Sequence, residues 1–191
     1  MQLNYKYFHN AIDMARKIMA LSIKNGDCVI DCTVGNGYDT LFLAKNVGLK
    51  GKVYGFDIQD TAIKSTKEKL IKENLYDRVI LINDGHENLQ KYVQEKVKLV
   101  VFNLGYLPNG DHNITTKPST TLEGIKSSLN VLNDNGIILI TSYTGHKGGI
   151  EEKDAIEEFL KELNQKKFNV LRFDFINQVN NPPILYGVEK L

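Results

Sequence analysis

The chain has 191 residues, of which 42% are hydrophobic and 25% charged, and its formal net charge is +1. This length and composition are typical of one soluble globular domain, here residues 1–191, with a core of substantial size. The near-neutral charge excludes a global basic field for nucleic acid but allows a local basic patch. No apolar run approaches the roughly 20 residues that span a membrane, and residues 1–21 lack the apolar segment of a signal peptide. We therefore expect a cytoplasmic protein.

The two cysteines, Cys28 and Cys32, lie around the first predicted strand. Four residues apart on one strand, their Cα atoms would be roughly 13 Å apart, which is too far for a disulfide. Two thiols without neighbouring histidines are too few for a zinc site, and the histidines are scattered along the chain. We therefore predict buried structural cysteines and no metal site.

The first predicted element is an amphipathic helix over residues 11–21, in which Ile12, Ala15 and Met19 recur at helical spacing. Asn10 directly precedes this helix and suits an N-cap.

A strand, a glycine turn and a helix are predicted next, between residues 29 and 47. The stretch V-I-D-C-T-V-G-N-G begins as an apolar run, becomes polar at Asp31 and ends on Gly35 and Gly37. Both glycines can adopt positive φ and let a ligand approach the backbone, and the next helix offers free N–H groups. This is the first unit of a doubly wound α/β fold, in which ligands lie across the carboxyl ends of the strands. A tight turn without a ligand is the alternative interpretation.

The second predicted strand, residues 52–58, carries Asp57 about 20 residues after the glycine turn, where a carboxylate would accept both hydroxyls of a ribose. A dinucleotide fingerprint also requires a third glycine, but Thr40 occupies that place. This absence, together with Asp31 before the turn, favours a nucleoside ligand without a pyrophosphate. S-adenosylmethionine fits, with Asp31 facing its α-amino group and Asp57 its ribose.

The remaining strands are predicted at residues 79–83, 99–104, 137–142, 169–176 and 184–190, and the remaining helices at 61–74, 120–132 and 151–166. We interpret the lysines of helix 61–74 as solvated surface, because glutamates interrupt them. Thr120 and Glu123 predict a capping box at the start of the following helix. Strand 79–83 ends in Asp84-Gly85-His86, at the edge where ligands bind in this fold.

Two irregular polar segments follow later strands, at residues 109–119 and 143–149. The first is long for a connection, so we expect a functional loop. Its side chains, among them Asp111 and Lys117, suit a phosphate or a polar substrate.

Two motifs resemble a known superfamily. D-C-T-V-G-N-G resembles motif I of class I methyltransferases, and G-F-D-I-Q resembles motif II. The resemblance implies a Rossmann-like, mostly parallel seven-stranded sheet with helices on both faces. It also implies that helix 11–21 covers the cofactor cleft, with His9 and Asn10 near the methionine end, and that Asp84 accepts from the adenine amine. The implied S-adenosylmethionine-binding residues are Asp31, Thr33, Gly35, Asn36, Gly37, Asp39, Asp57, Ile58, Gln59, Asp84, Gly85, His86, Asn103 and Leu104.

The segment N-L-G-Y-L-P, residues 103–108, resembles the Asn/Asp-Pro-Pro-aromatic motif of amino-group methyltransferases. In that motif the amide oxygen and the next carbonyl orient the target amine, and the aromatic ring stacks on the substrate. Asn103 and Tyr106 match these two roles and are the predicted catalytic residues. Leu104 and Gly105 replace the prolines, so the resemblance does not imply methylation of a base nitrogen.

Five further segments extend the resemblance over nearly the whole chain: D-G-H, N-L-G-Y-L-P-N-G-D, T-K-P-S-T-T, Y-T-G-H-K-G-G and N-Q-V-N-N-P-P. They resemble the small bacterial family labelled "putative rRNA methylase", whose members are associated with the tRNA wobble uridine. The resemblance implies methylation of the exocyclic amine of 5-aminomethyl-2-thiouridine at position 34, with a tRNA anticodon stem-loop as partner. The implied substrate-binding residues are Asp111, Lys117, Tyr143, His146 and Lys147.

Three alternatives stay open. The chain could methylate rRNA or a small-molecule amine, it could be a nicotinamide oxidoreductase, or it could bind S-adenosylmethionine without catalysis. The missing third glycine counts against the oxidoreductase, and the presence of Asn103 and Tyr106 counts against the binding module. The sequence leaves a homodimer open.

Overall fold

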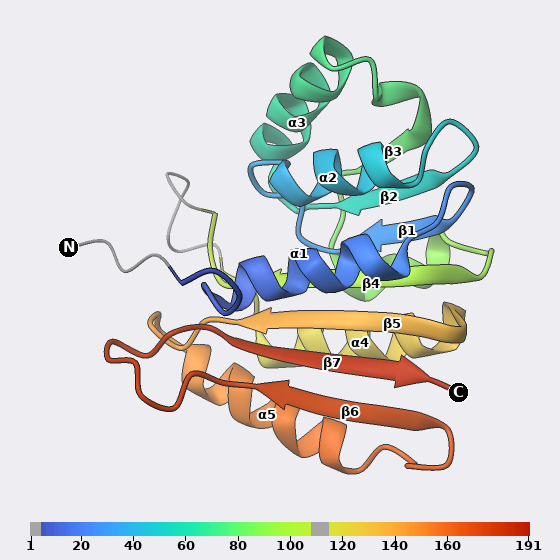
Figure 1. The fold of residues 1–191 in the computed structure, drawn as a ribbon. Helices are drawn as coiled ribbons and strands as arrows, with labels where there is room; N and C mark the ends of the chain where they lie inside the picture. The colour runs from blue at the N-terminus through green and yellow to red at the C-terminus, as the bar shows by residue number, and fades with distance from the viewer. Residues whose placement is uncertain (1–4, 108–114) are drawn as a thin grey trace.

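The structure is a computed structural model that describes residues 5–107 and 115–191 (Figure 1). Its elements are α1 (Ala11–Ser22), β1 (Cys28–Asp31), α2 (Tyr38–Asn46), β2 (Lys52–Phe56), α3 (Asp60–Lys72), η1 (Tyr76–Arg78), β3 (Val79–Ile82), η2 (His86–Lys91), β4 (Val97–Leu104), α4 (Pro118–Val131), β5 (Leu132–Ser142), α5 (Gly149–Lys161), β6 (Phe168–Phe173) and β7 (Ile184–Lys190). In this part of the chain no helix is long and apolar enough to cross a membrane.

Seven strands form one sheet in the order β3-β2-β1-β4-β5-β7-β6. The first five in this order pair in parallel, and β7 runs antiparallel to both β5 and β6. The predicted doubly wound, mostly parallel α/β fold is therefore confirmed, and β7, between β5 and β6, makes the sheet mixed.

Helices cover both faces of this sheet, because successive strand residues point to opposite sides. Val29 and Val101 pack with α1, α2 and α3 in one apolar cluster. Ile30 and Val100 pack with α4 and α5 in a second cluster. The central strands are thus buried on both faces, which explains their nearly continuous apolar sequences. Figure 1 shows α1 lying across the middle of the sheet.

Several predicted boundaries are confirmed, and others are wrong for local reasons. Asn10 is the N-cap of α1, since its Oδ1 accepts from Asp13 N at 2.8 Å. The predicted capping box is wrong: α4 begins at Pro118, and Thr120 Oγ1 donates to Lys117 O. Proline fits the first turn of a helix because its φ is already helical and it has no N–H to leave unpaired there.

The last predicted helix and the strand after it are both shorter than expected. Helix α5 ends at Lys161 rather than at residue 166, because Asn164 forms a turn in which its side chain accepts from Lys166 N and its carbonyl from Phe168 N. Strand β6 ends at Phe173. Because β6 ends earlier, its connection to β7 is longer than expected, and this connection contains Asn181, which lines the candidate site.

Candidate functional site

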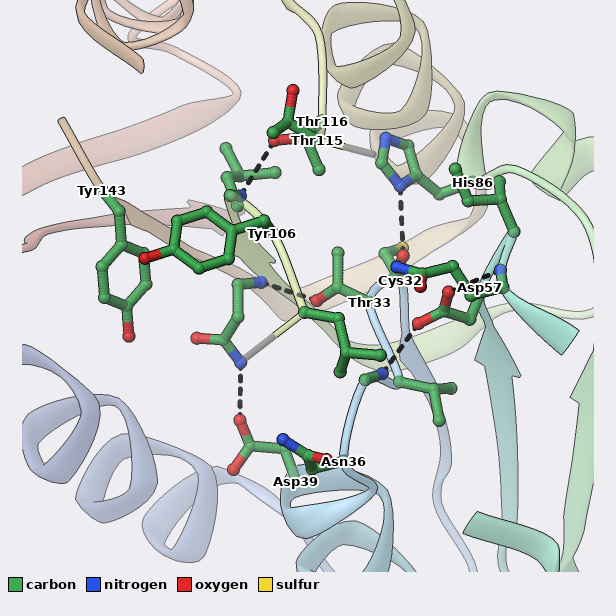
Figure 2. Close-up of a pocket in the computed structure, with 18 of the residues that line it drawn as sticks. Cys32, Thr33, Asn36, Asp39, Asp57, His86, Tyr106, Thr115, Thr116 and Tyr143 are labelled. Carbon is green, nitrogen blue, oxygen red and sulfur yellow. Dashed lines mark hydrogen bonds between the residues drawn. The ribbon is translucent and has the colours of Figure 1, made fainter. Parts of the chain in front are cut away.

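A cavity of about 840 Å³ lies at the carboxyl edge of the sheet, a volume within the usual range for ligand sites. It is lined by segments that follow β1, β2, β3, β4 and β5, and by residues of α1 and α4. Figure 2 shows Tyr106 and Tyr143 on the left of the cavity and Asp57 and His86 on the right. Loops that are distant in sequence therefore meet around one space, as parallel strands require.

The glycine turn after β1 has two functions. Gly35 has a φ of +50° and lines the cavity. Gly37 has a φ of +77° and faces α3, where an added Cβ would lie 2.5 Å from Thr66 Oγ1. Only Gly35 is therefore placed to face a ligand, while Gly37, which we expected to bind the cofactor, permits close packing of the turn on α3.

Asp57 lies at the end of β2, as expected, and lines the cavity together with Ile58 and Gln59. Its Oδ2 accepts from Gly35 N at 2.8 Å, and its Oδ1 accepts from Gln59 N at 2.9 Å. Burial raises the pKa of Asp57, and these two hydrogen bonds oppose the increase. Each carboxylate oxygen retains capacity to accept another donor.

Asp31 was expected to face a ligand amine, but it is fully buried and does not line the cavity. Its two oxygens accept from Thr33 N at 3.1 Å and from Thr40 Oγ1 at 2.6 Å. Burial, and then the charge of Asp39, raises the pKa of Asp31 to about 7. Thr40, which occupies the place of the third glycine, thus donates a hydrogen bond to the buried Asp31. Asp31 in turn stabilises the glycine turn from its buried side.

Asp39, in the first turn of α2, is the acidic side chain that reaches this part of the cavity. Its Oδ1 accepts from Arg16 Nε at 3.1 Å and Nη2 at 3.0 Å, and its Oδ2 accepts from Asn103 Nδ2 at 2.6 Å. Because a carboxylate only accepts, the amide must present its nitrogen to Asp39. The carbonyl oxygen of Asn103 is then available to the cavity. The backbone of Asn103 is also held, since its N donates to Thr33 Oγ1 at 2.7 Å.

Asp84 and Gly85 line the cavity after β3. The Asp84 carboxylate accepts from Gly85 N, Asn88 Nδ2 and Tyr92 OH at 2.8 to 2.9 Å. Burial acts to raise the pKa of Asp84, but these hydrogen bonds outweigh it and the pKa is lowered. Asp84 is therefore held as an ionised acceptor.

His86 also lines the cavity and is 7% exposed. Burial lowers its pKa, so the ring is neutral near pH 7. Its Nδ1 lies 3.1 Å from the Cys32 carbonyl and must donate to it, and its ring packs edge-on against Phe102. Nε2 has no partner among the described residues. The ring is a buried neutral acceptor rather than a cation.

The Asn-Leu-Gly-Tyr segment at the end of β4 forms the opposite side of the cavity. Leu104 and Tyr106 both line it, and Tyr106 is 42% exposed. Tyr106 pairs with Thr115 through an isolated β-bridge, which brings Lys117 to the same cavity. Tyr143 lines it from the end of β5, and burial followed by the charge of Asp39 raises its pKa.

The other predicted substrate residues are placed differently. Neither His146 nor Lys147 lines the cavity. Both ring nitrogens of His146 are buried and lack hydrogen-bond partners among the described residues, and the ring packs edge-on against Tyr106. The side chain is half-buried, with both ring nitrogens turned away from solvent. Asp111 lies outside the described residues.

Of the remaining predicted cofactor residues, Thr33 and Asn36 line the cavity. The structure adds Arg16 and Asn181, which sequence reasoning missed. Arg16 lies four residues after the cavity-lining Ile12 on α1, which is a readable signal once the helix is known to cover the cleft. Asn181 follows Asn180, and both have positive φ immediately before two prolines, so the N-N-P-P stretch indicated an unusual loop.

Neither cysteine has the character of a catalytic nucleophile. Both are free, and Cys32 lines the cavity from a buried position. Burial raises the pKa of the Cys32 thiol well above its usual value, and a thiol becomes a strong nucleophile only when its pKa is lowered. In the described part of the chain no group of three or more His, Cys, Asp or Glu residues could hold a metal ion. The site offers carboxylate and carbonyl acceptors and aromatic rings.

Comparisons with known proteins find related families and structures. The family model described as Putative rRNA methylase matches residues 53–189, and the model for protein-L-isoaspartate(D-aspartate) O-methyltransferase matches residues 1–94. A structure from Clostridium thermocellum, described as a putative rRNA-methylase, is 50% identical with a TM-score of 0.95, covering 99% of this chain and 100% of that one. A putative methyltransferase from Streptococcus mutans in complex with SAH is 39% identical with a TM-score of 0.88, and the same shares are covered. The chloroplastic tRNA (mnm(5)s(2)U34)-methyltransferase of Arabidopsis thaliana is 36% identical over 186 residues, which are 92% of this chain and 68% of that protein.

Proposed function

We propose that this chain, which belongs to the Putative rRNA methylase family and is an S-adenosylmethionine-dependent methyltransferase, methylates a tRNA wobble uridine. The target is the exocyclic amine of 5-aminomethyl-2-thiouridine at position 34, and the product is 5-methylaminomethyl-2-thiouridine. The observation that carries the proposal is the orientation of Asn103, whose carbonyl oxygen is kept available to the cavity by the contact of its nitrogen with Asp39. The Arabidopsis relative, whose printed name gives this nucleoside, supports the choice of substrate.

The cavity residues fit the cofactor by their chemistry. Asp57 and Asp84 are acceptors that match ribose hydroxyls and an adenine amine, and Gly35 leaves the backbone open beside them. We assign the adenosine half to this side of the cavity and the methionine half to the side nearer Arg16. S-adenosylmethionine supplies a methyl group bonded to a positively charged sulfur, which is an electrophile.

The chain then has to bind, align and deprotonate an alkyl amine. Asn103 Oδ1 and the Leu104 carbonyl accept from the amine, so that its lone pair points toward the methyl carbon. Tyr106 and Tyr143 line the part of the cavity that holds the uridine. The amine nitrogen would take the methyl group as the sulfur–carbon bond breaks, S-adenosylhomocysteine would leave, and the product ammonium would release its proton to solvent. Burial favours the neutral amine before transfer, because a low-dielectric site disfavours charge, and alignment alone contributes several kcal/mol to the lowering of the barrier.

A second candidate function is methylation of rRNA or of a small-molecule amine. The description of the family model favours rRNA. The near-neutral charge of the chain favours a small molecule over a large RNA.

One experiment separates these substrates. Cells that lack the gene supply undermethylated total tRNA, rRNA and a small-molecule extract, and each is incubated with purified protein and labelled S-adenosylmethionine. The label should enter tRNA and, after digestion, should be found in 5-methylaminomethyl-2-thiouridine. Label in rRNA or in the extract, with none in tRNA, would overturn the proposal. The Asn103→Ala variant serves as the control for background transfer.

A further inference from the structure

A buried carboxylate outside the cavity connects three segments around the site. Glu152 lies in the first turn of α5, is 1% exposed and does not line the cavity. Its Oε2 accepts from Thr116 Oγ1 at 2.7 Å, and its Oε1 accepts from Thr121 Oγ1 at 2.6 Å. No ion pair joins Glu152 to a cation in the described part of the chain. Burying a carboxylate that has no cation partner costs free energy. The two threonine hydroxyls that donate to Glu152 offset part of that cost.

Thr116 extends this contact to the substrate side of the cavity. Gly105 N donates to Thr116 Oγ1 at 2.9 Å, and Thr116 N donates to the Gly105 carbonyl at 2.9 Å. Thr116 donates its single hydroxyl proton to Glu152, so a lone pair of the same Thr116 oxygen accepts from Gly105 N. The result is an ordered chain of donors from Gly105 N through Thr116 Oγ1 to Glu152 Oε2.

Gly105 is the residue whose conformation sets both of its neighbours. It lies between Leu104 and Tyr106, and its φ of +141° lies in a region that side-chain-bearing residues rarely adopt. Rotation at Gly105 would turn the Tyr106 ring and the Leu104 carbonyl relative to the cavity. The two hydrogen bonds between Gly105 and Thr116, one donated by each residue, restrict that rotation.

We propose that Glu152 is a positioning residue, which orients the Thr116 hydroxyl so that it fixes Gly105 and with it the Leu104 carbonyl and the Tyr106 ring. This inference rests on the proposed function, in which those two groups hold the substrate. A carboxylate suits the task because it cannot donate, so the Thr116 proton has one destination. A glutamine would bring an amide that can donate to Thr116, compete with Gly105 for its lone pair and release the ordered arrangement.

The test compares Thr116→Val with Thr116→Ser and with the matched control Thr121→Val. Thr116→Val removes the hydroxyl at nearly constant volume, and turnover of the tRNA substrate should fall by about tenfold or more, as loss of alignment does. Thr116→Ser restores the hydroxyl and should restore turnover to within about threefold of the wild type. Thr121→Val removes one donor to Glu152 without touching Gly105, and should lower turnover less than Thr116→Val. Glu152→Gln should behave like Thr116→Val.

Two further measurements distinguish positioning from a general structural role. Affinity for S-adenosylhomocysteine, measured by calorimetry, should stay within about threefold in Thr116→Val, because the cofactor side is untouched. Hydrogen exchange of the Gly105 amide, followed by NMR in the full-length protein, should be faster in Thr116→Val and Glu152→Gln than in the wild type and Thr121→Val. Equal loss of turnover and cofactor affinity would overturn the proposal, as would unchanged exchange at Gly105.

The amide measurement does not depend on the identity of the substrate. If wild-type protein fails to methylate the tRNA, the proposed function is wrong, and the exchange rate of Gly105 still decides whether Glu152 and Thr116 hold this residue.

Discussion

Nδ2 of Asn103 lies 2.6 Å from Oδ2 of Asp39, and the other oxygen of Asp39 is held by Arg16. Three elements thus determine one amide orientation: α1 supplies Arg16, α2 supplies Asp39 and β4 supplies Asn103. Asp39 is 9% exposed, so rotation of the amide would place a carbonyl oxygen against a buried carboxylate. That arrangement is unfavourable because neither group can donate.

Replacement of Asn103 by alanine removes the acceptor proposed for the target amine. We expect kcat to fall by about a hundredfold, comparable with the loss of one preorganised hydrogen-bonding group in other enzymes. Affinity for S-adenosylhomocysteine should change little, because the amide oxygen of Asn103 is assigned to the target amine and not to the cofactor. Single-turnover kinetics and calorimetry measure the two quantities. Equal loss in both would contradict this assignment.

Replacement of Asp39 by asparagine should lower kcat by about tenfold. The neutral side chain pairs less well with Arg16 and no longer forces the amide of Asn103 into one orientation. In an Asn103→Ala background the same substitution should have almost no further effect on kcat, since its effect acts through the missing amide. A double-mutant cycle measures this, and additive losses would show that Asp39 acts independently.

Replacement of Asp57 by alanine should weaken the binding of S-adenosylhomocysteine by about ten- to a hundredfold, the range for loss of a hydrogen bond to a charged group. Part of the loss arises because the backbone N–H groups of Gly35 and Gln59, which donate to Asp57 in the wild type, lose their acceptor. Asp60→Ala is the matched control, because Asp60 is exposed and pairs only with Lys64 among the described residues. Unchanged affinity in Asp57→Ala would rule out the ribose assignment.

The buried Asp31 predicts a pH dependence of stability. Burial raises its pKa to about 7 in the folded protein, whereas an unfolded aspartate titrates near about 4. Between these values the folded state holds a proton that the unfolded state has lost, so the free energy of unfolding falls as pH rises from about 4 to about 7. Above that window the contribution is constant.

Asp31→Asn resembles the protonated acid and retains partners for Thr33 N and Thr40 Oγ1. The variant should be more stable than the wild type at pH 8, by about 2 kcal/mol, and the difference should shrink at pH 5. The lowered pKa of His86 acts in the opposite direction but is present in both proteins, so it cancels in the comparison. Urea unfolding at both pH values gives the difference, and a constant difference would contradict the raised pKa.

Much of the site was predictable because parallel strands place their carboxyl ends together. Apolar runs located the strands, and the residue after each run, such as Asp57 or Asp84, then had to lie at the ligand edge. The choice between Asp31 and Asp39 was not predictable in this way, since both flank the same turn. It depended on Thr40, whose hydroxyl donates to Asp31 and holds that side chain in its buried position.

Residues that reach the site from outside the strand ends were harder to predict. Arg16 depends on how α1 crosses the sheet, and Asn181 depends on the path of the chain between β6 and β7. Both are consequences of tertiary packing, which the local periodicity of one sequence does not encode. Glu152 was missed for the same reason, since its partners lie 31 and 36 residues away.

The proposed function depends most on one measurement, which is methyl transfer to a synthetic anticodon stem-loop. One stem-loop carries 5-aminomethyl-2-thiouridine at position 34, and the matched one carries 2-thiouridine, which lacks the amine. Both are incubated with the full-length protein and S-adenosylmethionine, and their nucleosides are analysed by mass spectrometry. We expect one added methyl group on the first nucleoside and none on the second. No transfer to the amine-bearing stem-loop or to full-length tRNA carrying the same nucleoside, by protein that binds S-adenosylhomocysteine, would contradict it.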